Sequence, residues 1–208
     1  MSNKKLLVDY MPFDISSDQI NESMKEHNGK LIVQGILQRA DSKNQNGRVY
    51  PRDTLMREAQ KYHETYINER RAMGELDHPE SSVVNLNNVS HNVTGMKWKG
   101  DDLVGTVEIL STPAGNILKE LFKSGIKLGI SSRGLGSVKE IHEDDSGEDT
   151  VEVQPDFELI AFDFVSNPST HGAFMHPAGL KEGVENKVTK SEKDSKVETI
   201  LNDILRGE

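Results

Sequence analysis

The 208-residue sequence predicts an α+β fold, in which helices flank a largely antiparallel β-sheet or barrel. More than five segments have the apolar, β-rich composition of strands, whereas two or three have the apolar spacing of amphipathic helices. The strands and helices do not alternate regularly along the chain, and no internal repeat is present. This order is typical of the α+β class.

In the N-terminal part, a first strand is expected to begin at Leu6–Val8, and a stronger one covers Lys30–Leu37. A short helix over Ser16–His27 separates them, and the turn Asn44–Gly47 follows. Apolar residues then recur at helical spacing and predict one amphipathic helix that ends near Arg70. These apolar residues are Leu55, Ala59, Tyr62 and Tyr66.

The middle of the chain predicts a β-hairpin, with strands over Val93–Trp98 and Leu103–Leu110 joined by Lys99–Asp102. The hydroxyl of Thr112 and the proline after it then begin a helix, which Gly125 ends. Its expected apolar face consists of Ile117, Leu118, Leu121 and Phe122.

Three further strands are expected in the C-terminal part. One leads into Ser131, and the other two cover Val138–Glu143 and Val151–Val165. The acidic stretch Asp144–Asp149 predicts a solvated hairpin turn between them, because it lacks the ordered alternation of a calcium-binding loop.

Composition divides the chain into a folded domain over residues 1–180 and a flexible charged tail over residues 181–208. The chain is 34% hydrophobic, below the roughly 45–50% of compact domains. The segment Lys181–Lys196 has no aromatic residue and buries too little apolar surface to offset the entropy of folding. A short amphipathic helix is expected at Val197–Leu205.

Composition also disfavours several classes of protein. No cysteine is present, which excludes disulfides and cysteine-bound zinc, and the net charge of −9 disfavours a nucleic-acid binder. No segment has the pattern of a signal peptide or a membrane span. We expect a soluble, intracellular protein with protein partners, without a cofactor or a metal. Four histidines lack the spacing of a metal site and are expected in loops or at the surface, namely His91, His142, His171 and His176.

The stretch Gly129–Ser137 contains the candidate nucleophile. Side chains alternate across a strand, so Leu128 and Ile130 share a face with Ser132, while Ser131 points the other way. Ser131 is therefore expected to be exposed. By itself, a pair of serines at a strand end is rarely catalytic.

A serine hydroxyl needs a base that accepts its proton, and the base needs a group that orients it. His78, held before a proline, is the candidate base, although such a histidine is by itself more often a turn residue. Strand alternation places Phe162 and Phe164 in the core and turns Asp163 out of it, which makes Asp163 the candidate orienting carboxylate.

Acyl transfer also needs hydrogen-bond donors that face the oxyanion. The glycines after Ser131 predict a tight turn, in which the backbone amides of Arg133 and Gly134 supply these donors. Gly134-Leu135-Gly136 is too short for a dinucleotide-binding or phosphate-binding signature.

Three motifs resemble, in order and spacing, the prohead core protease family of T-even-type tailed phages. They are Asn46–Pro51, Gly74–Pro79 and Gly129–Ser137. The resemblance runs from about Leu31 to Pro168. The catalytic His and Ser of that family match His78 and Ser131.

The resemblance implies a serine endopeptidase of capsid maturation, similar in fold to herpesvirus assemblins, with a β-barrel that carries the site on its outer face. Such an enzyme acts inside the immature capsid, or prohead, in the host cytoplasm, and cleaves scaffold, core and capsid proteins and its own termini. We also expect a homo-oligomer. The alternative function is a catalytically silent prohead core or scaffold protein that uses its acidic tail and terminal helix for assembly.

The third member of the catalytic group is open between Asp163, Glu158 and His171, because related viral proteases use a carboxylate or a histidine there. Strand phase and alignment favour Asp163. Asp77 is adjacent to His78, but neighbouring residues in an extended chain point apart, so Asp77 is not expected to orient the base.

The resemblance further implies cleavage after glutamate in the pattern Leu/Ile-x-Glu. Glu182, at the junction of domain and tail, is the first candidate for self-cleavage, and Glu22 is a weaker one. Matches ending at Glu120 and Glu69 lie in predicted helices and should be protected. A glutamate pocket needs a cation or several donors, and we hypothesise that the side chain of Arg133 contributes to it.

Overall fold

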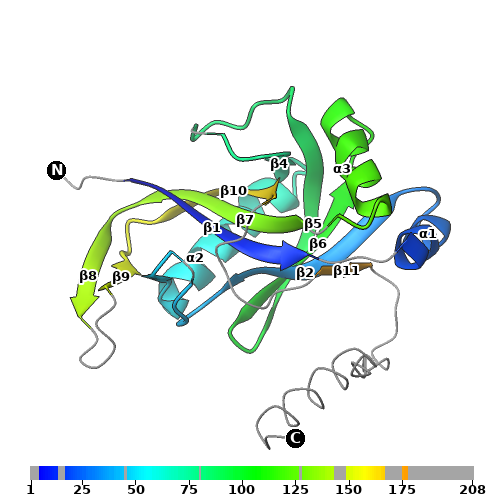
Figure 1. Cartoon of the computed structure of the whole chain (residues 1–208). Coiled ribbons are helices and arrows are strands. Elements are labelled where there is room, and N and C mark those ends of the chain that lie inside the picture. The colour runs from blue at the N-terminus through cyan, green and yellow to red at the C-terminus, as the bar shows by residue number, and fades with distance from the viewer. Residues whose placement is uncertain are drawn as a thin grey trace, which may run out of the picture.

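The computed structural model describes residues 5–13, 17–44, 46–79, 81–126, 128–142, 149–166 and 175–177. These segments contain three α-helices, one π-helical turn and eleven strands in three sheets (Figure 1). Of the strand pairs, only β3–β9 is parallel. The predicted α+β class with largely antiparallel pairing is therefore confirmed.

The first sheet has the order β1-β7-β10, and both of its pairs are antiparallel. β7 is the central strand and carries Ser131. The strand bounds are β1 at Lys5–Phe13, β7 at Leu128–Gly136 and β10 at Glu158–Val165.

The second sheet has the order β11-β2-β6-β5-β4 and contains the predicted hairpin. Gly100 turns the hairpin with a φ of +62°, a conformation that glycine adopts without steric cost. The strand bounds are β2 at Leu31–Arg39, β4 at Met73–Glu75, β5 at Val89–Lys99, β6 at Asp102–Ile109 and β11 at Met175–Pro177.

The third sheet has the order β3-β9-β8, and its β8–β9 hairpin projects from the body of the molecule (Figure 1). The single strand predicted over Val151–Val165 is wrong, because a turn divides it, with the amide of Phe157 donating to the carbonyl of Gln154. Pro155 lies within this turn and has no amide hydrogen to give to a sheet. The strand bounds are β3 at Arg48–Val49, β8 at Val138–His142 and β9 at Asp149–Val153. Residues 144–148 of the expected acidic turn lie outside the described residues.

A closed barrel is not present in the described segments, because the three sheets keep separate strand orders. The first and second sheets are joined instead by an isolated parallel bridge between Leu76 and Phe164. This bridge brings the end of β4 against β10 and thereby joins the chain before His78 to the strand of Asp163.

The helices begin close to where the sequence predicts them. The predicted helix ending near Arg70 is α-helical only to Tyr62, after which His63–Ile67 forms the π-helical turn η1. Thr112 caps α3 by accepting a hydrogen bond from the amide of Gly115 at 3.0 Å, as expected. Ile117 is 56% exposed, so its predicted place on the buried face is wrong. The helix bounds are α1 at Ser17–Glu26, α2 at Arg52–Tyr62 and α3 at Pro113–Lys123.

Aromatic side chains of β10 tie the helices to the first sheet. The ring of Tyr62 on α2 lies 5.6 Å from that of Phe162, and the ring of Phe122 on α3 lies 5.6 Å from that of Phe164. Both rings of β10 are fully buried, which fixes the strand that carries Asp163. No helix in the described segments has both the length and the apolar composition needed to span a membrane.

Candidate active site

Ser131 lies in the middle of β7, directly opposite Asp163 on β10. Directly opposite residues of an antiparallel pair point to the same face, with Cβ atoms about 4.5–5.5 Å apart. Ser132 faces the other way, and its hydroxyl accepts a hydrogen bond from Gln38 Nε2 on β2 at 2.8 Å. The predicted alternation of the two serines is therefore confirmed.

The expected exposure of Ser131 is wrong, because both it and Asp163 have an exposed fraction of 0%. Residues Leu128–Gly134 are all buried, so both faces of β7 are covered. Alternation indicates which face a side chain occupies, but whether that face meets solvent depends on segments distant in the sequence.

The carboxylate of Asp163 has hydrogen-bond partners on two strands, β7 and β4. Its Oδ2 accepts from Arg133 Nε at 2.8 Å, and its Oδ1 accepts from Arg133 Nη2 at 3.1 Å and from the amide of Glu75 at 2.9 Å. Burial alone would raise the pKa of Asp163, but His78, the charge of Arg133 and the Glu75 amide outweigh burial and hold the pKa below its usual value. Asp163 is thus kept ionised inside the protein.

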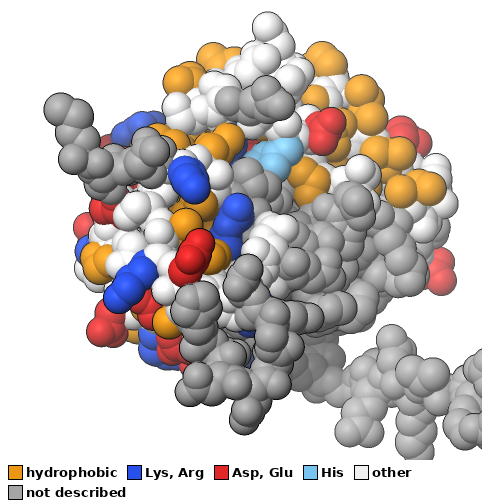
Figure 2. Space-filling view, turned by 60° about the vertical axis from the view of Figure 1, so that its left-hand side comes forward, with side chains coloured by type: hydrophobic (Ala, Val, Ile, Leu, Met, Phe, Trp, Pro, Cys, Tyr) orange, Lys and Arg blue, Asp and Glu red, His pale blue; other side chains and the backbone are white. Residues whose placement is uncertain are grey.

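The ring of His78 reaches the same carboxylate. Its Nδ1 lies 3.2 Å from Asp163 Oδ2, and the side chain is 19% exposed. The chain turns toward this position at Asp77, which has a φ of +69° and donates its amide to the carbonyl of Phe164 at 2.8 Å. On the face drawn in Figure 2, a histidine side chain reaches the surface close to hydrophobic side chains and an acidic one.

Asp77 itself holds the backbone rather than the ring. Its Oδ1 accepts from the amide of His78 at 2.9 Å. This agrees with the expectation that Asp77 does not orient the base, and it gives Asp77 a role in shaping the turn.

Four buried side-chain atoms at this site lack a hydrogen-bond partner among the described residues, namely Ser131 Oγ, His78 Nδ1, His78 Nε2 and Glu75 Oε2. In acyl transfer, a serine oxygen and a histidine nitrogen exchange one proton, and the bond between them often tightens only when substrate binds. The arrangement therefore brings a serine hydroxyl, an imidazole and an ionised carboxylate together beside the β7–β10 pair, and these are the groups that such a proton transfer needs.

Residues 5–185 of the chain match the family model described as "Prohead core protein serine protease". The chain belongs to this family. It is therefore a serine protease.

Two relatives bear out the family and the fold of this prohead protease. The "Prohead core protein protease" of Enterobacteria phage T4 is 29% identical over 182 residues, which cover 83% of this chain and 84% of that protein. The solved structure of the bacteriophage T4 capsid assembly protease, gp21, has a TM-score of 0.66 and 24% identity, and the match covers 80% of this chain and 99% of that chain.

In this protease, the hypothesis that the Arg133 side chain recognises substrate is wrong. The guanidinium is fully buried and binds Asp163, Glu75 Oε1 at 3.0 Å and the carbonyl of Ser81 at 2.6 Å. An arginine held by two buried carboxylates is not available to a third one.

The tight turn expected at Arg133 and Gly134 is also wrong, because both residues lie within β7 between two paired strands. Gly134 is needed for packing instead. A Cβ there would lie 2.4 Å from a ring carbon of Phe157 and 2.6 Å from the carbonyl oxygen of Glu158.

Of the other contenders for the third catalytic position, Glu158 is not brought to His78. Glu158 is exposed at the start of β10, five residues from Asp163 or about 16 Å along an extended strand. His171 lies outside the described residues.

The self-cleavage candidates differ in what the structure describes. Glu182 lies outside the described residues. Glu22 lies inside α1, two residues after Ile20, which is fully buried and anchors the helix. Because a protease needs an extended segment, Glu22 is protected while α1 is folded.

His91 is not the surface or loop histidine expected from the sequence. It is fully buried, with Nε2 2.8 Å from the carbonyl of Phe162 and Nδ1 2.8 Å from Ser90 Oγ. A carbonyl can only accept, so Nε2 carries the hydrogen. Burial lowers the pKa of His91 to about 4, against the opposing influence of Asp163 and Phe162.

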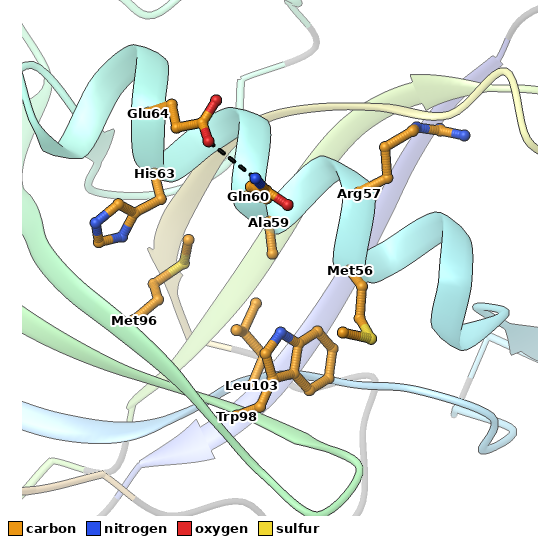
Figure 3. A pocket seen from close by; sticks show the side chains of 9 residues that line it. All are labelled: Met56, Arg57, Ala59, Gln60, His63, Glu64, Met96, Trp98 and Leu103. Atoms are coloured by element: carbon orange, nitrogen blue, oxygen red, sulfur yellow. Dashed lines mark hydrogen bonds between the residues drawn. The ribbon is translucent and has the colours of Figure 1, made fainter.

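A separate pocket of about 320 Å³ lies between α2, η1 and the β5–β6 hairpin (Figure 3). Neither Ser131 nor His78 lines it. Its walls are formed by Met56, Arg57, Ala59, Gln60, His63, Glu64, Met96, Trp98 and Leu103.

The sequence analysis missed Glu75, although it lies in the Gly74–Pro79 motif. Its exposed fraction is 0%, and its carboxylate binds Arg133. The sequence did contain a signal for it. Glu75 is a carboxylate between Gly74 and Leu76, in a segment that forms a strand, and a charged residue there indicates a buried ion pair.

Proposed function

We propose that this serine protease cleaves scaffold, core and capsid proteins inside the prohead during phage capsid maturation, and also cleaves its own termini. The family match and the name of the T4 relative support this substrate class. The proposal includes a protease domain over residues 1–180, a processed tail over residues 181–208, self-association and location in the host cytoplasm. It also includes a likeness in fold to herpesvirus assemblins, which superposition of a crystal structure would test.

In the proposed mechanism, Ser131 Oγ attacks the scissile carbonyl while His78 Nε2 accepts its proton. His78 then returns the proton to the leaving amine, and water repeats the cycle on the acyl-enzyme. Asp163 orients His78 and stabilises its charged form. The observation that carries this assignment is the 3.2 Å approach of His78 Nδ1 to a carboxylate that lies directly opposite Ser131.

The amides of Arg133 and Gly134 are the proposed oxyanion donors, because they are the backbone donors that follow two and three residues after Ser131. In the described conformation they belong to a strand with a neighbour on each side. Their use in catalysis requires the pairing on one side of β7 to open when the peptide binds.

We propose cleavage after glutamate, with Glu182 as the first self-cleavage site and Glu22 as the second. The buried Arg133 leaves recognition of that glutamate to other donors. Because α1 protects Glu22, cleavage there is expected only when the N-terminal segment opens.

Intact mass measured over time tests the function, with wild type beside Ser131→Ala at matched purity. We expect only the wild type to be shortened, first after Glu182. Equal trimming of both proteins would exclude Ser131 as the nucleophile. If both stay whole and a serine-directed probe labels neither, the assignment of the site fails.

A further inference from the structure

We propose that Glu75 is a positioning residue of this protease, whose buried charge favours the protonated form of His78 that arises when Ser131 attacks. The inference rests on the proposed roles of Ser131, His78 and Asp163. Glu75 does not touch the reacting atoms and acts through Arg133 and Asp163.

Glu75 is joined to the site by its backbone and by its side chain. Its amide donates to Asp163 Oδ1 at 2.9 Å, and its Oε1 accepts from Arg133 Nη2 at 3.0 Å. The side chains of Glu75, Arg133 and Asp163 all have an exposed fraction of 0%. Water therefore screens the charges of this cluster very little.

The charge balance of the cluster depends on Glu75. Two carboxylates share one guanidinium, so the cluster carries one net negative charge while His78 is neutral. A second proton on the His78 ring, which gives the imidazolium, makes the whole group neutral. Because an unbalanced buried charge is unfavourable, the cluster stabilises the imidazolium. Without Glu75, Arg133 and Asp163 would already balance each other, and the imidazolium would add an uncompensated positive charge.

The other titratable groups facing the cluster do not supply this charge. Burial raises the pKa of Tyr62, so its hydroxyl stays neutral, and His91 with a pKa of about 4 is neutral at the pH of the cytoplasm. Asp77 is exposed, and its carboxylate binds the backbone amide of His78 in contact with solvent.

Glu75 also fastens the chain that follows His78. Its Oε1 accepts from the amide of Asn85 at 3.0 Å, while Arg133 Nη1 donates to the carbonyl of Ser81 at 2.6 Å. The segment after the base is thus held at two points by the same buried cluster.

The test measures the rate at which a fluorophosphonate probe labels the full-length protein, as a function of pH. In Glu75→Gln, the side-chain amide oxygen can still accept from Arg133 Nη2 and from the amide of Asn85, while the negative charge is removed. We expect the acid limb of the labelling profile to move to lower pH by about half to one unit, and the maximal rate to fall about three- to tenfold. Acid unfolding of a less stable variant would move the acid limb to higher pH, so a loss of stability alone does not produce the expected shift to lower pH.

Glu58→Gln is the matched control. Glu58 is also buried, and it accepts from the amide of Leu159 at 3.1 Å and from Arg57 Nε at 3.0 Å. Leu159 is four residues from Asp163, about 13 Å along the strand. This control is expected to lose stability without a shift of the acid limb to lower pH.

Glu75→Asp keeps the charge and shortens the side chain, so its acid limb is expected at the wild-type position. An unmoved limb in Glu75→Gln, or an equal shift in Glu58→Gln, overturns the proposal. If Glu75→Gln does not fold, a limb moved to lower pH in Glu75→Asp overturns it, and an unmoved limb supports it. Labelling that persists in Ser131→Ala, or is absent from the wild type, contradicts the proposed function itself.

Discussion

The guanidinium of Arg133 binds both carboxylate oxygens of Asp163, with Nε 2.8 Å from Oδ2 and Nη2 3.1 Å from Oδ1. The two residues are on neighbouring strands of one sheet, and neither side chain meets solvent. This paired geometry fixes the plane of the Asp163 carboxylate. It therefore also fixes the direction from which the ring of His78 can approach that carboxylate. Arg133 thus holds Asp163, the proposed orienting carboxylate, and its guanidinium is not available to bind substrate.

Replacement of Arg133 by methionine is expected to lower the free energy of unfolding by about 3–5 kcal/mol, because it leaves Asp163 and Glu75 buried without their cation. Urea denaturation of the Ser131→Ala background avoids self-cleavage during the measurement. Lys123→Ala is the control, since Lys123 pairs with Glu120 at the surface and such pairs contribute at most about 1 kcal/mol. An equal loss of unfolding free energy in both variants would show that the buried ion pairs of Arg133 contribute no more to stability than a surface pair.

The sequence was sufficient to predict the elements that depend on local signals. The Thr112 cap, the Gly100 turn and the opposite directions of Ser131 and Ser132 follow from backbone geometry within a few residues. The helix after Pro51 was only partly predictable, because apolar spacing continues through the π-helical turn at His63–Ile67.

Features that depend on distant contacts were not predictable in the same way. The burial of Ser131 depends on strands from other parts of the chain, and Glu75 binds Arg133 across 58 positions. A glycine can indicate either a turn or the close packing of another residue against the backbone, and the sequence around Gly134 does not distinguish the two. The structure shows close packing, because the ring of Phe157 lies against Gly134.

Gly134→Ala tests that packing. An added Cβ would meet the Phe157 ring at 2.4 Å and the Glu158 carbonyl at 2.6 Å, so β7 or β10 must shift. We expect a loss of about 1–3 kcal/mol in the free energy of unfolding. Gly95→Ala on β5 is the control, because nothing lies within 4 Å of the position of its added Cβ. A stable Gly134→Ala protein would mean that β7 and β10 pair less closely than described.

His91 predicts how stability depends on pH. Its pKa is about 4 in the folded protein and 6.5 when unperturbed, so the unfolded chain binds a proton that the folded chain does not. This contribution to stability is complete above about pH 6.5 and is lost as pH falls toward 4, to a total of about 3 kcal/mol. Denaturation curves between these pH values should show a smaller loss for His91→Gln than for wild type. Identical slopes would show that His91 does not titrate with unfolding.

The conformation of Asp77 is expected to affect activity, because Asp77 precedes His78, the proposed base, and sets the direction of the backbone there. Its φ of +69° is tolerated by aspartate and asparagine better than by alanine, and its Oδ1 accepts from the amide of His78. We expect Asp77→Asn to keep the labelling rate of the wild type within about twofold, because both features survive. Asp77→Ala should lower the rate about tenfold or more, because it strains the turn and removes the acceptor that sets the position of His78. Labelling with a fluorophosphonate at one pH measures both variants, and urea denaturation separates misplacement of His78 from unfolding. If Asp77→Asn is as slow as Asp77→Ala while both stay folded, the negative charge of Asp77 matters and the turn geometry does not explain its role.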